Sequence, residues 1–252
     1  MAAGIQVFTP SGDLQIDDSF LNYRFLGKST IIADTYGDSF NWAGTWYKDV
    51  ADYCYPGELL AFRREDIEFE PDTTRRFATT ASASYLISNN GKIGFRVLPE
   101  SNYGYFDTNR PLITIYRFGL TTENEKGKHF EVFDSTGKLV FSDGRNYMRV
   151  VQGLNGLDLA LPTGYGDNRP IPAVFANINH SPSIKTAMAI LSTAFYWETA
   201  PGYTWEVAHG FAFYPDRVEV RYVLSGGYSE GGGVQWDSQR HYHILMLDVT
   251  GL

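Results

Sequence analysis

An internal repeat constrains this sequence more than any other feature. Residues 5–26 align with residues 130–151 at a constant offset of 125 positions, and six of the 22 pairs are identical. Residue usage alone would give about one or two identities over that length. The identical pairs are Val7 with Val132, Phe8 with Phe133, Gly12 with Gly137, Leu14 with Leu139, Asp18 with Asp143 and Arg24 with Arg149. Because the offset is about half of the 252 residues, the sequence predicts two copies of one unit.

Both halves consist of short aromatic and β-branched runs separated by Gly, Asn, Asp and Pro, which is typical of strands and hairpins. The same offset of 125 carries Lys92–Arg96 onto Arg217–Arg221. The clearest hairpin is expected over Tyr85–Val97, since Asn90-Gly91 readily forms the tight turn between two antiparallel strands. Each copy of the repeat has Val-Phe, then a short connection ending in Gly, which predicts a hairpin whose Gly has a positive φ.

Two segments leave a helical alternative open. Ser183–Phe195 has apolar residues at helical spacing, and Lys48–Tyr53 could form one turn. The repeat puts a β segment at the place that matches Ser183–Phe195, so we expect strands there. Arg217–Leu224 alternates strictly, which predicts a strand with one face in water. The sequence therefore predicts an all-β fold with little helix: two tandem, internally repeated β-sandwich-like domains over residues 1–122 and 123–252.

The composition excludes several classes of partner. The chain has 29 acidic and 21 basic residues, a net charge of −8. Nucleic-acid binding needs a basic face, so no nucleic-acid partner is expected. The most apolar stretch, Thr186–Trp197, is too short to span a bilayer, so no membrane insertion is expected. The first residues lack the basic region and apolar run of a secretory signal, which predicts synthesis in a cytoplasm without export by that route.

Residues suited to catalysis or metal binding are sparse. Cys54 is the only cysteine, and its setting in Tyr-Cys-Tyr-Pro indicates a packed structural thiol. His241 and His243 have the spacing that turns both rings to one face of a strand, but a metal site needs three or four ligands. Paired carboxylates such as Asp17 with Asp18 serve glycoside hydrolysis only when they face each other across a cleft. We predict no catalytic residues, no metal and no cofactor.

Three aromatic clusters beside Gly or Pro are the candidate surface contacts. They comprise Tyr228 and Trp236 in the Gly-rich stretch 225–238, Trp205 and Tyr203 beside Pro201-Gly202, and Trp42, Trp46 and Tyr47 near Gly37 and Gly44. Loops that carry isolated aromatic residues are where β scaffolds place binding contacts, and such rings stack on sugars or become buried in a partner. The alternative is that most of these tryptophans fill cores or the interface between the halves.

The opening of the chain resembles small tail proteins of tailed bacteriophages. The resemblance rests on Gly4-Ile-Gln-Val-Phe8, on Gly12, Leu14, Ile16 and Asp18, and on Arg24-Phe-Leu-Gly27, so it covers about the first 27 residues. The second copy repeats this opening with Glu131 in place of Gln6 and with Val150-Val151 in place of Phe25-Leu26. The motif includes no catalytic residue.

The resemblance implies a virion component of the tail tip, baseplate or tail fibre, assembled in the host cytoplasm. Its partners would be other phage tail proteins, with several copies around the tail axis. Contact with a host cell-surface glycan or protein would be a further role. The alternative is a carbohydrate-binding, lectin-like module that recognises a cell-surface glycan. A glycan-degrading enzyme is a third hypothesis, disfavoured because no carboxylate constellation stands out.

Overall fold

The fold is all-β, as the sequence predicts. The computed structural model describes residues 6–8, 14–17, 23–32, 35–36, 46–49, 57–65, 79–89, 92–99, 112–120, 130–134, 136–142, 146–163, 174–201, 203–224 and 235–252. These residues form nineteen strands and no helix. The strand interpretation of Ser183–Phe195 is confirmed, and the helical alternative is wrong for Lys48 and Asp49, which lie in a strand.

The strands of the two halves follow one another along the chain. In the first half they are β1 (Gln6–Phe8), β2 (Leu14–Asp17), β3 (Tyr23–Ile32), β4 (Thr35–Tyr36), β5 (Trp46–Asp49), β6 (Leu59–Arg64), β7 (Thr79–Asn89), β8 (Lys92–Pro99) and β9 (Leu112–Leu120). In the second half they are β10 (Glu131–Phe133), β11 (Leu139–Ser142), β12 (Arg149–Leu157), β13 (Val174–Asn179), β14 (Thr186–Ser192), β15 (Phe195–Ala200), β16 (Tyr203–Phe213), β17 (Arg217–Leu224), β18 (Gln235–Gln239) and β19 (His241–Asp248).

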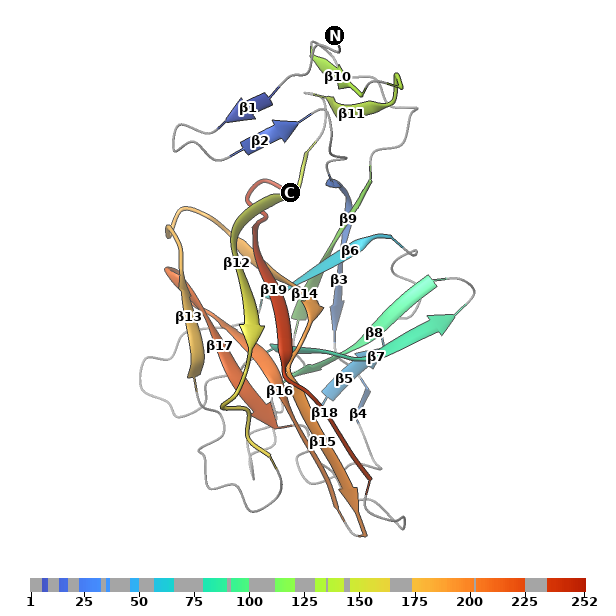
Figure 1. The fold of residues 1–252 in the computed structure, drawn as a ribbon, viewed down its shortest axis with the longest axis vertical. Helices are drawn as coiled ribbons and strands as arrows, with labels where there is room; N and C mark the ends of the chain where they lie inside the picture. Colours follow the sequence, from blue (N-terminus) through green and yellow to red (C-terminus); the bar gives the residue numbers. More distant parts are fainter. Residues whose placement is uncertain are drawn as a thin grey trace.

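Two large antiparallel sheets contain most of these strands (Figure 1). The six-stranded sheet has the order β12-β19-β14-β6-β9-β3. The nine-stranded sheet has the order β13-β17-β16-β7-β8-β5-β4, with β15 pairing with β16 and β18 with β15. Both sheets run from one half of the chain into the other, through the pairs β14–β6 and β16–β7. The predicted boundary between residues 122 and 123 lies outside the described residues and stays a prediction.

The predicted hairpins are confirmed by strand register. Asn89 pairs with Lys92, which leaves the two residues Asn90-Gly91 between β7 and β8. The hairpins β1–β2 and β10–β11 match pair for pair at the offset of 125, and both have a register shift before the same phenylalanine. In the second hairpin Gly137 has a φ of 84°, the left-handed conformation expected of it.

The repeat extends into the six-stranded sheet. Strand β3 shifts register between Phe25 and Gly27 against β9, and β12 shifts between Val150 and Gln152 against β19, which are equivalent positions. One row of paired residues then crosses the whole sheet: Gly153, Leu245, Ala189, Ala61, Tyr116 and Lys28. The row is symmetric about the Ala61–Ala189 pair. The two halves are therefore related by a pseudo-twofold axis that passes between β6 and β14.

The inner strands of the six-stranded sheet have buried residues on both faces. In the second half one face packs against the nine-stranded sheet, through Ile178, Met188, Phe211, Phe213, Val218, Val220, Ile244 and Met246. The other face holds a core of Ala61, Tyr116, Phe118, Ala187, Ala189, Leu247 and Val249. Both alanines on the pseudo-twofold axis are fully buried, so small side chains allow the halves to pack closely there.

The two edges of the six-stranded sheet meet at one end. Residues 146–148, which lead into β12 at one edge, bond to β3 at the other edge. The amide of Phe25 donates to the carbonyl of Asn146 at 2.7 Å, and the amide of Met148 donates to the carbonyl of Tyr23 at 2.8 Å. The sheet is therefore strongly curled, and its inner core of alanine and aromatic side chains is enclosed at this end.

Candidate functional site

Five of the seven predicted contact residues lie on strands. Tyr203 and Trp205 belong to β16, Trp236 belongs to β18, and Trp46 and Tyr47 belong to β5. The other two, Tyr228 and Trp42, lie outside the described residues.

Strand pairing brings two of the predicted clusters into one row. Glu198 in β15 is paired with Trp205 on one side and with Trp236 on the other. Two residues before Glu198 in β15, Tyr196 is buried and donates its hydroxyl to the Glu198 carboxylate at 2.9 Å. The third cluster is separate in the topology, because β5 pairs with β4 and β8.

A buried polar network lies between the two sheets, beyond the apolar core. Asp158 follows β12, and its carboxylate binds two side chains that are paired across β16 and β17. Nε2 of His209 lies 2.9 Å from Oδ2 of Asp158, and the Tyr222 hydroxyl donates to Oδ1 at 3.0 Å. The amide of Ala160 also donates to Oδ1, at 3.0 Å. All three groups therefore depend on one carboxylate.

Aromatic rings enclose His209. The ring of Phe175 stacks on the imidazole at 4.5 Å between centroids, and Tyr242 meets it edge-on at 5.5 Å. The side chain of His209 is fully buried, and its Nδ1 has no hydrogen-bond partner among the described residues. An unpaired buried nitrogen costs free energy. The position of His209 is set by its one side-chain hydrogen bond, to Asp158, and by its packing against the aromatic rings.

The electrostatics of this network favour an ionised Asp158. Burial raises the pKa of Asp158, but the hydrogen bonds from His209 and Tyr222 outweigh that effect, so the net pKa lies below its ordinary value. Nε2 of His209 therefore carries the proton that it donates. A histidine oriented by an aspartate is also found in nucleophilic catalysis, but here both side chains are inaccessible to a substrate.

Sequence reasoning missed this network. Its one signal is that His209 stands inside the apolar run Val207-Ala208-His209-Gly210-Phe211, where a polar residue needs a buried partner. Nothing in the sequence identifies Asp158 as that partner, since it lies 51 residues away.

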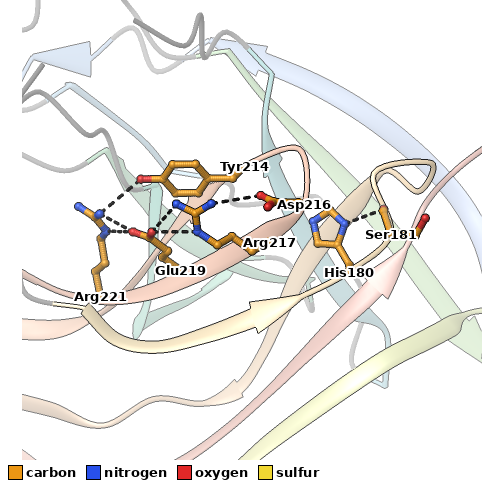
Figure 2. A network of polar contacts seen from close by, with 7 residues as sticks. All are labelled: His180, Ser181, Tyr214, Asp216, Arg217, Glu219 and Arg221. Carbon is orange, nitrogen blue, oxygen red and sulfur yellow. Dashed lines mark hydrogen bonds and ion pairs between the residues drawn. The ribbon is translucent and has the colours of Figure 1, made fainter. Parts of the chain in front are cut away.

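A second polar cluster lies on the opposite face of β17 (Figure 2). Arg217, Glu219 and Arg221 alternate with the core residues Val218 and Val220. Nε and Nη2 of Arg217 donate to Oε1 of Glu219 at 3.1 and 3.0 Å. Nε of Arg221 donates to Oε2 at 2.9 Å, and its Nη2 binds the same oxygen. The prediction that this face is in water is wrong for Glu219 and Arg221, which are both buried.

Charge compensation explains how this face can be buried. Burial raises the pKa of Glu219, but the two guanidinium groups more than offset that effect and hold the pKa below its ordinary value. The ring of Tyr214 lies 4.0 Å from the Arg217 guanidinium carbon, and its hydroxyl accepts a 3.4 Å hydrogen bond from Arg221. Alternation in a sequence shows which residues share a face, but not whether that face is covered.

The two small hairpins form a third candidate site, at the same end of the molecule (Figure 1). In the second hairpin, Asp134 organises the turn. Its Oδ1 accepts hydrogen bonds from the amides of Thr136 and Lys138 at 2.8 and 2.9 Å and from the Thr136 hydroxyl at 2.7 Å. The hydroxyl and the Lys138 amide lower the pKa of Asp134. The turn is therefore fixed locally, without help from the large sheets.

The second hairpin exposes aromatic side chains. Val132 is buried, but Phe130 and Phe133 are 43% and 49% exposed. Phe130 contacts Phe141 edge-on at 6.1 Å, and Phe141 stacks on Tyr147 at 4.7 Å. The hairpin thus has a small aromatic cluster beneath it and apolar rings left in contact with solvent. We call Phe130 and Phe133 the hairpin surface.

Comparison with protein-family models, curated proteins and solved structures finds no match. Within the described ranges, no helix is long and apolar enough to cross a membrane. The same ranges contain no group of three or more His, Cys, Asp or Glu side chains that could hold a metal ion. His241 and His243 both lie on β19 and are both exposed.

Proposed function

We propose that this protein is a structural component of a bacteriophage virion, located in the tail tip, baseplate or tail fibre and acting by protein–protein contacts. The observation that carries the proposal is the pair of repeat-equivalent hairpins, which have the same register and lie at one end of the molecule. The resemblance of the opening residues to phage tail proteins falls on the first of these hairpins.

A contact role gives a physical reason for this pair. A two-stranded hairpin is only marginally stable alone in water and usually needs a surface to pack against. Each of these hairpins is a separate two-stranded sheet that does not join the large sheets. The hairpin surface offers exposed aromatic rings to a partner, and aromatic residues dominate the energetic centres of protein interfaces.

Labelling of virus particles tests the proposal. An antibody raised against the purified chain would be applied to phage particles from the source bacterium and located by negative-stain microscopy with gold. We expect gold at the distal end of the tail. Unlabelled particles, together with a strong signal for the chain inside infected cells, would rule out a virion role.

A substitution in the hairpin surface separates assembly from folding. Phe133→Ser removes an exposed ring, so it should leave the unfolding midpoint almost unchanged while reducing incorporation into particles by about tenfold or more. Leu191→Ser is the matched control, because Leu191 is 48% exposed on β14, away from the hairpins. Equal incorporation of both variants would show that the hairpin surface makes no contact.

A carbohydrate-binding module is the second candidate, and the row Trp236–Glu198–Trp205 favours it. Aromatic rings and a carboxylate are the groups that sugar sites commonly combine. This function predicts saturable binding on a glycan array, lost in Trp236→Ala and Trp205→Ala variants that still fold. A glycan array without signal would exclude the carbohydrate-binding module and would not affect the proposed role in virion assembly.

A further inference from the structure

Strand β12 is an open edge of the six-stranded sheet. Over Val150–Leu157 it pairs only with β19, and its other side bonds to no described strand. Its residues are exposed or half-buried throughout, including Val150, Val151 and Leu157. Such an edge presents a row of unpaired amide and carbonyl groups that can add a further strand.

The sequence of this edge lacks two of the usual protective features, charge and proline. Natural edge strands are blunted by charged residues, by proline or by a covering segment. The stretch Val-Val-Gln-Gly-Leu-Asn-Gly-Leu at 150–157 has neither charge nor proline. The one charged residue of β12, Arg149, lies at the start of the strand and forms a salt bridge with Asp248 at 3.3 Å. The open edge is therefore uncharged and partly apolar along eight residues.

The fold indicates which strand would cover this edge. It already joins its halves twice by antiparallel pairing across the pseudo-twofold axis, through β6 with β14 and through β7 with β16. In the first of these junctions, the equivalent residues Ala61 and Ala189 face each other. Antiparallel pairing of two strands across a twofold axis is thus the way in which this architecture extends a sheet.

The other edge of the sheet is less suited to strand addition. Strand β3 is the repeat equivalent of β12, but it carries Lys28, whose Nζ donates to the carbonyl of Leu252 at 2.6 Å. The first residues of β3 are already bonded to residues 146–148. Strand β12 is therefore the edge whose outer backbone groups bond to no described strand and which has no charge to keep another strand away.

We propose that β12 of one copy pairs antiparallel with β12 of a second copy, which gives a twofold-symmetric dimer with a continuous sheet. A twofold interface uses the same patch on both copies, and the uncharged edge meets that requirement without bringing like charges together. In this dimer the exposed side chains of Val150, Val151 and Leu157 become buried at the interface. The dimer does not depend on a role in the virion.

Sedimentation of the full chain at several concentrations tests the proposal. We expect a dimer of twice 28.3 kDa that dissociates on dilution. Leu157→Lys should raise the dissociation constant by about tenfold or more, because it places a lysine from each copy on the paired edge. Ile32→Lys is the matched control: Ile32 occupies the equivalent position on β3 and is 47% exposed, against 55% for Leu157.

Each result decides the proposal. A dimer weakened by Leu157→Lys but not by Ile32→Lys supports β12–β12 pairing. Weakening by both variants would indicate head-to-tail pairing of β3 with β12 and would overturn the twofold dimer, as would a monomer at every concentration. Where Leu157→Lys does not fold, Val150→Lys replaces it, since Val150 is also exposed on β12.

Disulfide cross-linking provides an independent measurement. With Cys54 replaced by Ser, single cysteines are placed in turn at each position from Val150 to Leu157 of β12. In a twofold antiparallel pairing the residue on the axis lies beside its own copy, so we expect a disulfide-linked dimer from the cysteine at that position. A cysteine at Leu191, on the inner strand β14, is the control. Absence of cross-linking at every one of these β12 positions would contradict the pairing.

Discussion

Strand β17 separates two buried polar networks that compensate charge in different ways. On the face toward the six-stranded sheet, Tyr222 and His209 converge on the single carboxylate of Asp158. On the opposite face, Glu219 is held between Arg217 and Arg221. The first network pairs one carboxylate with a histidine and a neutral hydroxyl. The second contains three charges, of which the two guanidinium groups stay charged at any ordinary pH.

This difference determines how much stability each network should lose when the charge of its central carboxylate is removed. Loss of Glu219 would leave two positive charges close together on a covered face. Loss of the Asp158 charge would weaken the hydrogen bonds from His209 and Tyr222, but it would leave no pair of guanidinium groups facing each other. The arginine network should therefore be more sensitive to removal of its central carboxylate, although both carboxylates have a lowered pKa.

The largest expected effect is that of Glu219→Gln. Removing the charge leaves Arg221 buried without compensation, and breaking a buried ion pair in this way costs about 3–5 kcal/mol of unfolding free energy. Urea denaturation measures the loss. Asp216→Asn is the control, because Asp216 is exposed and its bridge to Arg217 should be worth less than about 1 kcal/mol. Equal losses from both variants would show that burial of the network is unimportant.

Asp158→Asn should cost less, about 1–3 kcal/mol. The amide keeps one oxygen as an acceptor, but its NH₂ group replaces the other oxygen and cannot accept the proton on His209. The same denaturation series measures the change. A loss larger than that of Glu219→Gln would reverse the order of the two networks and would contradict the argument from charge.

Acid should weaken both networks, because protonation removes the charge of each central carboxyl group. A carboxyl group with a lowered pKa binds fewer protons in the folded state than in the unfolded state. Its stabilising effect is present above its ordinary pKa, 3.8 for Asp158 and 4.5 for Glu219, and is lost as the pH falls through the folded value. Unfolding free energy should therefore fall below about pH 4.5.

The two substituted proteins check this assignment. Each should show a flatter decline in acid than the wild type, because the variant no longer has the carboxyl group that titrates. An unchanged slope in both variants would place the acid sensitivity elsewhere in the chain.

The sequence predicted local pairing well, because local pairing is set by turns and alternation. The hairpins at the repeat, the pairing of Asn89 with Lys92 and the positive φ of Gly137 all depend on residues close together in the chain. The sequence did not predict that the halves share both large sheets. The pairs β14–β6 and β16–β7 join strands over a hundred residues apart, and no turn residue specifies such a register.

Burial was the second feature that the sequence could not supply. Alternation placed Glu219 and Arg221 on one face correctly, but their burial depends on what packs over that face. His209 was visible as a polar residue in an apolar run, whereas Asp158 became its partner only through the fold. The aromatic contact residues remain predictions, although β15 brings Trp205 and Trp236 into one row.

The smallest expected effects compare one hydroxyl on each face of this region. Tyr222→Phe removes a buried donor at 3.0 Å from Oδ1 of Asp158, which keeps the Ala160 amide, and should cost about 1 kcal/mol at neutral pH. Tyr214→Phe removes an acceptor at 3.4 Å from Arg221, whose Nε and Nη2 still bind Glu219, so its cost should be below about 0.5 kcal/mol. The ring over Arg217 remains in that variant.

The cost of Tyr222→Phe should shrink in acid, where Asp158 becomes protonated and the hydroxyl loses its charged acceptor. Thermal unfolding of both variants at two pH values measures this difference, and a pH-independent gap would show that the Asp158 charge does not strengthen the bond.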